Sequence, residues 1–433
     1  MRTWHGGTRV ALVVWTCLVV GGVAARAAAA DPPLALDAIL SDARDRNPEL
    51  AAARERAAAL RQTPRQAAAW DDPMLSWEAW NTPNSFRIDR ADNNIFKLSQ
   101  KIPFPGKRRL AGEVAAHDAA RGTSEAERVE LALVAAVKTA YYALWETHAK
   151  LALLERDRDL VTRLTRAVER KYGTGEASQA DALRLQVELT HLANQIETQR
   201  LVIERARADL AALLSRPSSA VRGAPVTPAP PRLALSLDAL VATALATRPD
   251  VRGEDEAIAR DATAVELAHK NRLPDFEVSV SRFVNDDMPD GFGASAAVSL
   301  PIFNRAKYAA ALDEANARLA ASRAEKRRVE DAVRREVERA FLATRTALLQ
   351  HDLFSATHVP HAEQALRVTE GAYETGDGTF GELIDTLRGV QSVHLEHLAA
   401  QGEFERAFAE LEEAVGTALP RGGAAPTHEG RHE

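Results

Sequence analysis

The 433-residue sequence predicts a mainly helical fold with a small β part, built from long antiparallel coiled-coil hairpins and four strands. Three observations favour this class. Aromatic residues are only 5% of the chain and Ala is abundant, which suits long helices better than a large sheet. Two heptad-patterned segments far exceed the mean globular helix of about 11–12 residues. Four short segments alternate apolar and polar residues, as half-buried strands do.

Each half of the sequence runs through the same elements, and the ranges follow from periodicity and from Gly and Pro positions. In the first half we expect helices over 34–46 and 48–69, the second kinked at Pro64. Strands over 72–81 and 94–102 follow, then a helix over 107–171 and a return helix over 178–214. The second half repeats the strands around 276–281 and 294–300. It continues with a helix over 305–372, kinked at Pro360, and a return helix over 379–416.

The halves are an internal repeat with an offset of 201 residues. Leu34-Ala35-Leu36-Asp37-Ala38 matches Leu235-Ser236-Leu237-Asp238-Ala239, and Tyr172-Gly173-Thr174-Gly175 matches Tyr373-Glu374-Thr375-Gly376. Chance similarity between Ala-rich helices does not explain one offset shared by different element types. We therefore expect a first repeat over 31–217, a Pro-rich linker over 218–232, a second repeat over 233–419 and a disordered tail over 420–433.

The first thirty residues are typical of a secretory signal peptide. Arg2 and Arg9 precede an apolar stretch over 10–20, and Ala28-Ala29-Ala30 offers a cleavage site. Two alternatives are weaker. The apolar stretch is shorter than the ~20 residues of a spanning helix, and Trp15 and Thr16 stand before Cys17 where a lipidation site has small residues. The chain is expected to be exported, with no spanning helix after Ala30.

Composition and motifs exclude several function classes. The 55 basic and 61 acidic residues leave a net charge of −6, which argues against nucleic-acid binding. A single Cys excludes a disulfide framework and a Cys-based zinc site. His358 and His361, and likewise His394 and His397, are three apart, but neither pair has a convincing third ligand. No nucleophile–base pair or phosphate loop occurs, so we expect no enzyme, no cofactor and no metal site.

The predicted strands have one apolar and one polar face. The apolar face carries Leu75, Trp77, Phe96, Leu98, Phe276, Val278, Val280, Val298 and Leu300, and the polar face carries Glu78, Lys97, Ser99, Lys101, Glu277 and Ser279. Four strands cannot close a barrel, and open sheet edges are not tolerated in lipid. Two chains would supply 8 strands and three would supply 12, enough for a channel. A soluble sheet on a helical core is the alternative, although a compact domain has no use for such long helices.

Three motifs resemble those of the TolC-type outer-membrane efflux proteins of Gram-negative bacteria. They are the strand-to-helix junctions at 98–107 and 299–303 and the helical turn at 373–385, and the likeness covers about Leu34 to Leu419. The resemblance implies a homotrimer with a 12-stranded barrel in outer-membrane lipid and a periplasmic α-helical barrel. It also implies a periplasmic adaptor, an inner-membrane pump, and export of small molecules or metal ions. The junction over 103–107 and residues 72–75 look most like members that serve heavy-metal pumps of the resistance-nodulation-division type.

The same resemblance points to residues at two helical turns. Glu382 and Asp385 match the family's aperture acids, and Asp181 stands at the repeat equivalent of Glu382. Rings of carboxylates in a trimer favour cations, although a solvated helix face is the plain alternative. Tip latch candidates are Tyr172, Tyr373, Arg184 and Arg388. The adaptor-docking turns carry Gly173, Thr174, Gly175, Thr375, Gly376 and Gly378, whose glycines are expected to permit positive φ.

Two other functions stay open at this stage. A duct for type I protein secretion differs little in sequence, because the cargo is selected by the pump. A soluble periplasmic coiled-coil adaptor or scaffold would contain a lipoyl-like β module between its helices, and none is visible in the sequence.

Overall fold

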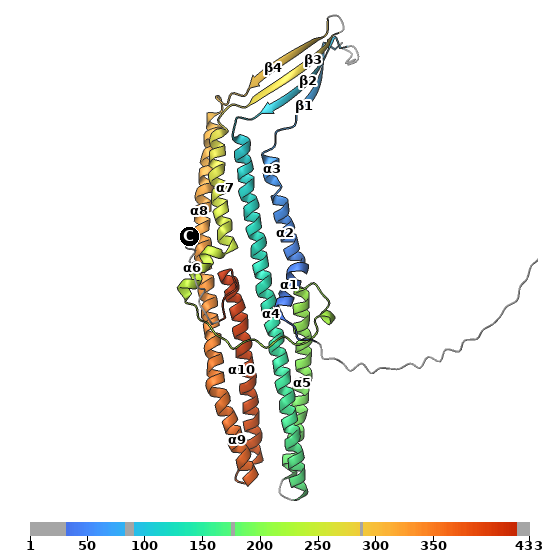
Figure 1. Cartoon of the computed structure of the whole chain (residues 1–433), viewed down its shortest axis with the longest axis vertical. Helices are drawn as coiled ribbons and strands as arrows, with labels where there is room; N and C mark the ends of the chain where they lie inside the picture. Colours follow the sequence, from blue (N-terminus) through green and yellow to red (C-terminus); the bar gives the residue numbers. More distant parts are fainter. Residues whose placement is uncertain (1–31, 83–90, 175–177, 286–288, 422–433) are drawn as a thin grey trace, which may run out of the picture.

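A computed structural model describes residues 32–82, 91–174, 178–285 and 289–421. The predicted signal peptide, most of the predicted tail and Gly175 lie outside these residues. The molecule is elongated, with a sheet at one end and the tips of two helical hairpins at the other (Figure 1). In the described ranges, no helix has a stretch apolar enough to cross a membrane.

The first repeat is built around one very long helix. Helices α1 (Leu36–Arg46), α2 (Pro48–Leu60) and α3 (Thr63–Ala67) lead to strands β1 (Met74–Trp80) and β2 (Asn93–Ile102). Helix α4 (Lys107–Gly173) then runs from the sheet to the tip over 67 residues, or about 100 Å at 1.5 Å per residue. Helix α5 (Gln179–Leu213) returns along its lower half. The predicted heptad seam is buried at Val137, Tyr141 and Leu144.

The second repeat follows the same order after a short 3-10 turn, η2 (Ser218–Ala220). Helices α6 (Leu237–Thr247) and α7 (Pro249–Lys270) lead to strands β3 (Phe276–Asn285) and β4 (Gly291–Val298). Helix α8 (Arg305–Leu353), the π-helical turn η3 (Phe354–His358) and helix α9 (Val359–Thr375) together correspond to α4. Helix α10 (Phe380–Val415) is the return helix.

Two predicted helices are interrupted at their prolines. The helix expected over 48–69 is two helices, because Pro64 has no N–H to donate to the carbonyl of Leu60, which accepts from the Thr63 hydroxyl instead (2.7 Å). The helix expected over 305–372 changes to a π turn at 354–358, immediately before Pro360. A π turn adds a residue to one turn of the hydrogen-bond ladder, and so accommodates the missing donor.

The four strands form one antiparallel sheet in the order β1-β2-β3-β4, so β1 and β4 are its edges. In the register, Leu75 faces Leu98, which faces Val280 and then Ala294. One residue along, Ser99 faces Ser279, which faces Ser295. Alternate residues point to opposite faces, so the sheet has the apolar face and the polar face that the sequence predicts.

Each repeat has its own hydrophobic core at the waist of the molecule. In the first, Leu50, Val137, Leu144 and Leu210 join α2, α4 and α5. In the second, Val251, Val337, Phe404 and Leu411 join α7, α8 and α10. A third core near the tip combines α4, α5 and α10, and therefore connects the two repeats. The lower half of the molecule is a row of helices in the order α5, α4, α10 and then α8 with α9.

The sheet is fixed to the helices by one buried lysine. Lys107 at the start of α4 donates from Nζ to Asp275 Oδ1 (2.8 Å) and to the Leu273 carbonyl (2.8 Å). The same Asp275 oxygen accepts the Phe104 backbone N–H (2.8 Å). The segments that lead into α4 and into β3 are thereby held together, which sets the position of the sheet above the helices.

Candidate functional site

Helices α4 and α9 end in different ways at the tip of the molecule. Gly376 has φ of 85°, and ends α9 in the left-handed conformation that glycine favours. Gly378 packs so closely on Ala372 that an added Cβ would lie 3.1 Å from the Ala372 Cβ. Gly173 is the last helical residue of α4 and its cap Thr174 has φ of −97°. The expected positive φ is thus confirmed at Gly376. It is wrong at Gly173, which is the last helical residue of α4, and at Gly378, which Ala372 approaches closely.

The side chains of Thr174 and Thr375 stabilise these turns locally. The Thr174 hydroxyl donates to the Lys171 carbonyl (3.0 Å). The Thr375 hydroxyl has two acceptors within hydrogen-bond distance of its single proton, the Gly371 carbonyl (3.2 Å) and Asp377 Oδ2 (3.0 Å). Both hydroxyls are therefore engaged at helix ends, and these ends of α4 and α9 lie at the extremity of the molecule opposite the sheet (Figure 1).

Two of the three candidate aperture acids are helix caps. Asp181 accepts the Ser178 backbone N–H (3.2 Å), and Glu382 accepts the Thr379 N–H (3.0 Å), each in a reciprocal capping box that begins α5 or α10. The Thr379 amide lowers the pKa of the Glu382 carboxyl, because this hydrogen bond favours the charged form. Both carboxylates thus stabilise the first turns of their helices, and this role favours the charged form of Glu382.

Asp385 is the third candidate, and its environment is different. Its side chain is 81% exposed and its nearest charged partner is Arg388, with Nη1 3.9 Å from Oδ1. An ion pair this open contributes little to stability. The carboxylate is therefore open to solvent, while Glu382 one turn earlier is engaged in its cap.

Tyr373 brings the two turns together. Its ring makes an edge contact with Phe380 (centroids 5.6 Å apart), and the ammonium of Lys171 lies 4.9 Å from its centroid. Burial raises the pKa of the Tyr373 phenol, and the negative charge of Asp181 raises it further. Tyr373 therefore sits between α4 and α10. Tyr172, by contrast, is half exposed, and Arg184 lies over Gly381 with its guanidinium 3.9 Å from Asp181.

An ion pair from Arg388 joins the two hairpins near the tip. It donates from Nε (2.9 Å) and from Nη2 (2.6 Å) to Oε2 of Glu188 on α5, whose side chain is only 1% exposed. This carboxylate raises the pKa of the Arg388 guanidinium still further, chiefly through the hydrogen bond. Of the four latch candidates, Arg388 is thus the one that joins α10 to α5 directly.

The sequence prediction missed Glu188, although a signal was present. The buried residues Leu185, Leu192 and Ile196 form a seam with spacings of seven and four, and Glu188 occupies the position three residues after Leu185. An acidic residue in an apolar seam has to be paired when the seam is buried. This pattern could have predicted a basic partner, but it could not have identified Arg388.

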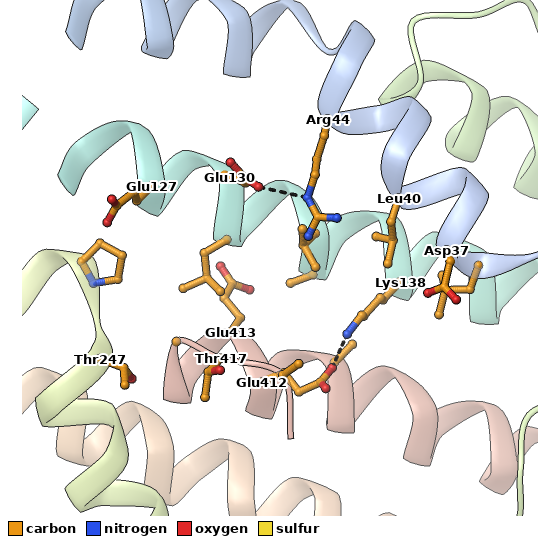
Figure 2. A pocket seen from close by; sticks show the side chains of 18 of the residues that line it. Asp37, Leu40, Arg44, Glu127, Glu130, Lys138, Thr247, Glu412, Glu413 and Thr417 are labelled. Atoms are coloured by element: carbon orange, nitrogen blue, oxygen red, sulfur yellow. Dashed lines mark hydrogen bonds and ion pairs between the residues drawn. The ribbon is translucent and has the colours of Figure 1, made fainter. Parts of the chain in front are cut away.

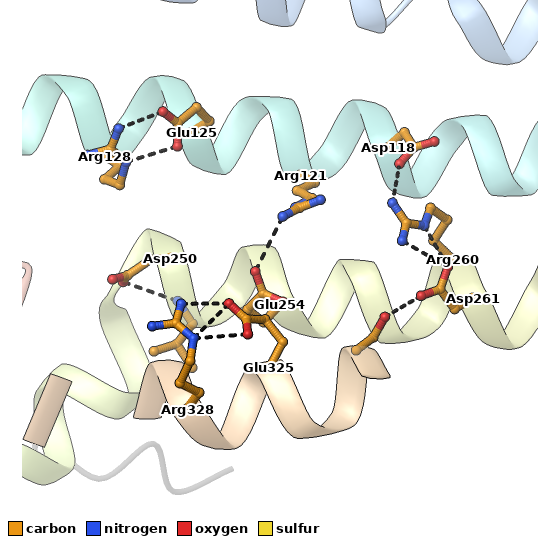
Figure 3. Close-up of polar contacts among 12 residues, drawn as sticks. Asp118, Arg121, Glu125, Arg128, Asp250, Glu254, Arg260, Asp261, Glu325 and Arg328 are labelled. Atoms are coloured by element: carbon orange, nitrogen blue, oxygen red, sulfur yellow. Dashed lines mark hydrogen bonds and ion pairs between the residues drawn. The ribbon is translucent and has the colours of Figure 1, made fainter. Parts of the chain in front are cut away.

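The upper half of the helical part is held by a series of ion pairs (Figure 3). Arg260 of α7 reaches Asp118 of α4 (3.2 Å), Arg121 of α4 reaches Glu254 of α7 (3.4 Å), and Lys326 of α8 reaches Asp255 of α7 (2.5 Å). The charges on facing helices are complementary at each of these steps. These pairs join α4 to α7 and α7 to α8.

A pocket at the waist lies where the repeats meet (Figure 2). It is lined by residues of α1, α4 and α10 and by the start of α7. Arg44 pairs with Glu130 across it (2.9 Å), and Lys138 pairs with Glu412 (2.6 Å). The first pair lies within the first repeat, and the second joins the first repeat to the second. Among the described residues, no three His, Cys, Asp or Glu side chains are grouped so that they could hold a metal ion.

All nine residues of the predicted apolar face of the sheet region are exposed in the single chain. Leu75, Leu98 and Val280, which face one another across β1, β2 and β3, are each more than half exposed. On the opposite face the hydroxyls of Ser279 and Ser295 hydrogen-bond to each other (2.7 Å). The sheet thus presents a continuous apolar surface that the helices do not cover.

Comparison with known proteins agrees with this architecture. No curated protein matches the sequence. The fold is similar to that of VceC of Vibrio cholerae (17% identity, TM-score 0.70, 88% of this chain and 96% of VceC covered). It is also similar to the open MtrE outer-membrane channel of Neisseria gonorrhoeae (19%, 0.67, 89% and 90%) and to CusC, described as forming a transmembrane channel (17%, 0.72, 88% and 92%).

Family membership rests on a separate comparison of sequence patterns. The model of the outer membrane efflux protein family matches the chain twice, over residues 39–216 and 240–417. The two matched segments are 201 residues apart, the offset of the internal repeat. The chain belongs to the outer membrane efflux protein family.

Proposed function

We propose that the chain is one subunit of a homotrimeric outer-membrane channel, the exit duct of a tripartite efflux system. In this proposal the sheet lies in outer-membrane lipid and the helices extend through the periplasm. An inner-membrane pump and a periplasmic adaptor deliver small molecules or metal ions to the duct, which performs no catalysis.

The sheet carries the proposal. Its edge strands β1 and β4 have no further strand partner among the described residues, and its apolar face is exposed. In lipid, both edges must be hydrogen-bonded. Three copies joined β4 to β1 would give 12 strands, which is wide enough to leave a channel. The apolar face would then meet lipid and the polar face would line the lumen.

The helical part offers two further surfaces for assembly. We define the α5 stripe as Leu183, Val187 and Leu201, and the α8 stripe as Leu342, Leu349 and Leu353; every member of both is more than half exposed. The spacings of four, seven and fourteen place each stripe on one face of its helix. Because α5 and α8 are the outer helices of the lower row, the α5 stripe of one copy can pack on the α8 stripe of the next. Such a heterologous contact closes into a ring.

The tip supplies the aperture in this proposal. Asp385 contributes a ring of three exposed carboxylates, while Asp181 and Glu382 keep the first turns of α5 and α10 in place beside it. Arg388 and Tyr373 hold the hairpins together beside the aperture. The adaptor docks on the turns that contain Gly173, Thr174, Thr375, Gly376 and Gly378.

In this proposal the pump selects the cargo. The chain by itself therefore indicates a class of cargo and not a particular compound. The likeness of its strand-to-helix junctions to heavy-metal members favours metal ions or small molecules. A duct for type I protein secretion is the second candidate, because the same architecture would serve it.

The test is whether the protein forms a channel. The full chain should be extracted by detergent from the outer-membrane fraction, should have the mass of a trimer by light scattering, and should give stepwise conductance in a planar bilayer. A monomer that stays in the aqueous fraction after lysis would overturn the proposal. The double variant Leu349→Glu/Leu353→Glu should abolish the trimer because it places charge in the α8 stripe. Gln350→Glu, which adds one negative charge at an exposed neighbour outside the α8 stripe, is the control and should assemble normally.

A further inference from the structure

The junction between sheet and helices concentrates positive charge. Residues 65–72, 103–110, 269–275 and 299–308 are the segments at this level, where α3, α4, α7 and α8 end below the strands (Figure 1). They contain eight Lys and Arg residues and only three Asp, although the whole chain has a net charge of −6. The positive charge is thus specific to one level of the molecule.

Much of this charge is not neutralised within the protein. Of the three acids, Asp275 pairs with the buried Lys107, and Asp71 lies 4.0 Å from Lys101 of the polar sheet face. Asp72 forms no ion pair with a described basic residue. Arg109 pairs with Glu113 one turn further along α4. Within the described ranges, no carboxylate lies within 4.0 Å of the charged groups of the other basic residues at this level. These are Arg65, Arg108, Lys270, Arg272, Arg305 and Lys307.

Exposed apolar side chains lie in the same segments. Phe303 is 89% exposed and belongs to the segment that joins β4 to α8, together with Leu300 and Ile302, which are more than half exposed. Trp70, just before β1, is also more than half exposed, and the guanidinium of Arg108 lies 3.9 Å from its ring centroid. Such exposure to water is unfavourable for large apolar groups, and contiguous exposed patches mark contact surfaces.

Basic and exposed apolar side chains in the same segments together fit the surface of a membrane. Aromatic and basic side chains are enriched where a protein passes through the headgroup region of a membrane, since the apolar parts enter the lipid and the charges meet phosphates. In addition, α4 and α8 begin with basic residues and no acid, whereas α5 and α10 begin with Asp181 and Glu382. Positive charge at a helix N-terminus opposes the helix dipole, and an anion at that place offsets this cost.

We propose that this junction patch binds the headgroups of anionic phospholipids in the leaflet next to the helices. The patch consists of Arg108, Lys270, Arg272, Arg305 and Lys307 with Trp70, Leu300, Ile302 and Phe303. The proposal rests on the proposed function, because it requires the sheet to lie in a membrane. It adds a lipid preference, which anchors the channel at a fixed depth: Phe303 and its neighbours enter the acyl region, and the basic groups hold the phosphates.

The test measures which lipid stays on the purified protein. The full-length trimer in detergent is mixed with equal amounts of phosphatidylglycerol and phosphatidylcholine, and bound lipid is counted by native mass spectrometry. We expect phosphatidylglycerol to be retained in preference, and Arg305→Gln/Lys307→Gln to weaken that preference at least about tenfold, since each basic residue near an anionic surface contributes about 1 kcal/mol. The matched control is Arg323→Gln/Arg327→Gln, which removes two exposed charges about 27 Å further along α8.

The outcomes separate the two proposals. Equal retention of both lipids by a trimer that conducts would overturn the lipid preference and leave the channel standing. An equal loss in the control variant would also overturn it, because the effect would then be one of net charge. Failure to form any trimer would overturn the channel and the lipid site together. Phosphatidylglycerol retention that 0.5 M NaCl abolishes would support the electrostatic contact, because salt screens it.

Discussion

Arg388 on α10 and Glu188 on α5 are 200 residues apart in the chain, yet two hydrogen bonds join the guanidinium to one carboxylate oxygen. The pair lies beside the tip core of α4, α5 and α10, and ties the first hairpin to the second. The geometry is asymmetric, because Glu188 is buried while half of the Arg388 side chain is exposed.

We expect Arg388→Ala to loosen the tip, because it leaves the buried Glu188 carboxylate without a partner. The cost is at most about 3 kcal/mol, since the exposed side of the pair lets water reach the carboxylate. Hydrogen exchange should accelerate in residues 185–192 and 384–391 and stay unchanged at the waist. The double variant Glu188→Leu/Arg388→Leu should exchange more slowly than Arg388→Ala, because it removes both charges. Unaltered exchange in Arg388→Ala would show that the pair does not hold the hairpins.

Asp385→Ala is expected to raise single-channel conductance in a planar bilayer and to reduce the preference for cations. In the proposed trimer it removes three exposed charges from the aperture. Glu382→Gln is an informative companion, because an amide oxygen can still accept the Thr379 N–H and preserve the cap. The matched control is Asp331→Asn, which removes an exposed acid higher on α8 and should leave the conductance unaltered. An unchanged conductance in Asp385→Ala would remove Asp385 from the aperture.

We expect His397 to make the second hairpin sensitive to mild acid. Its ring lies 5.1 Å from that of His351, and its Nε2 is buried without a hydrogen-bond partner among the described residues. Neighbouring groups are His394, whose Nε2 is 3.4 Å from Glu363 on α9, Asp352 beside His351, and Asp157 on α4, which interacts with His394. Burial lowers the pKa of His397 below its ordinary value of 6.5, and the charges of His351 and His394 lower it further.

The sign of the effect follows from proton binding. As the pH falls below 6.5, the unfolded chain binds a proton at His397 before the folded chain does, so the free energy of unfolding falls. We expect denaturant titrations to show a smaller loss of stability between pH 7.5 and pH 5.5 for His397→Gln than for the wild type. His361→Gln, an exposed histidine of α9, is the control and should behave like the wild type. Parallel curves for all three proteins would contradict this prediction.

Asp275→Ala should weaken the attachment of the sheet to the helices. It leaves Lys107, whose side chain is only 11% exposed, with a carbonyl as its remaining partner and frees the Phe104 N–H. Breaking such a pair costs about 3 kcal/mol or more. The trimer should therefore dissociate at a lower temperature in detergent, as followed by gel electrophoresis of heated samples. Asp72→Ala, an exposed acid before β1, should not lower that temperature.

The sequence predicted those parts of the fold in which apolar residues recur at a short spacing along one helix or strand. Alternation in β2 and β3 placed Leu98 and Val280 on one face, and spacing of three and four placed Val137 and Leu144 in the seam, because both patterns are properties of a single element. The contacts of the candidate site could not be predicted in this way, because they join different elements. The link between Glu188 and Arg388 depends on how two hairpins pack, and the capping of Glu382 depends on the backbone at Thr379. Pro360 predicted an interruption, but only the three-dimensional ladder revealed a π turn over 354–358.

The uninterrupted α4 and the π turn between α8 and α9 make the two hairpins mechanically unequal. Helix α9 has no buried residue and packs on α10 and the π turn, whereas α4 has buried residues along its length and neighbours on both sides. In the proposed trimer, six hairpins would surround the duct with near sixfold symmetry. Only the three hairpins that contain the π turn would bend readily. Widening of the lower end would therefore move these three hairpins, while the three built on α4 stay in place between them.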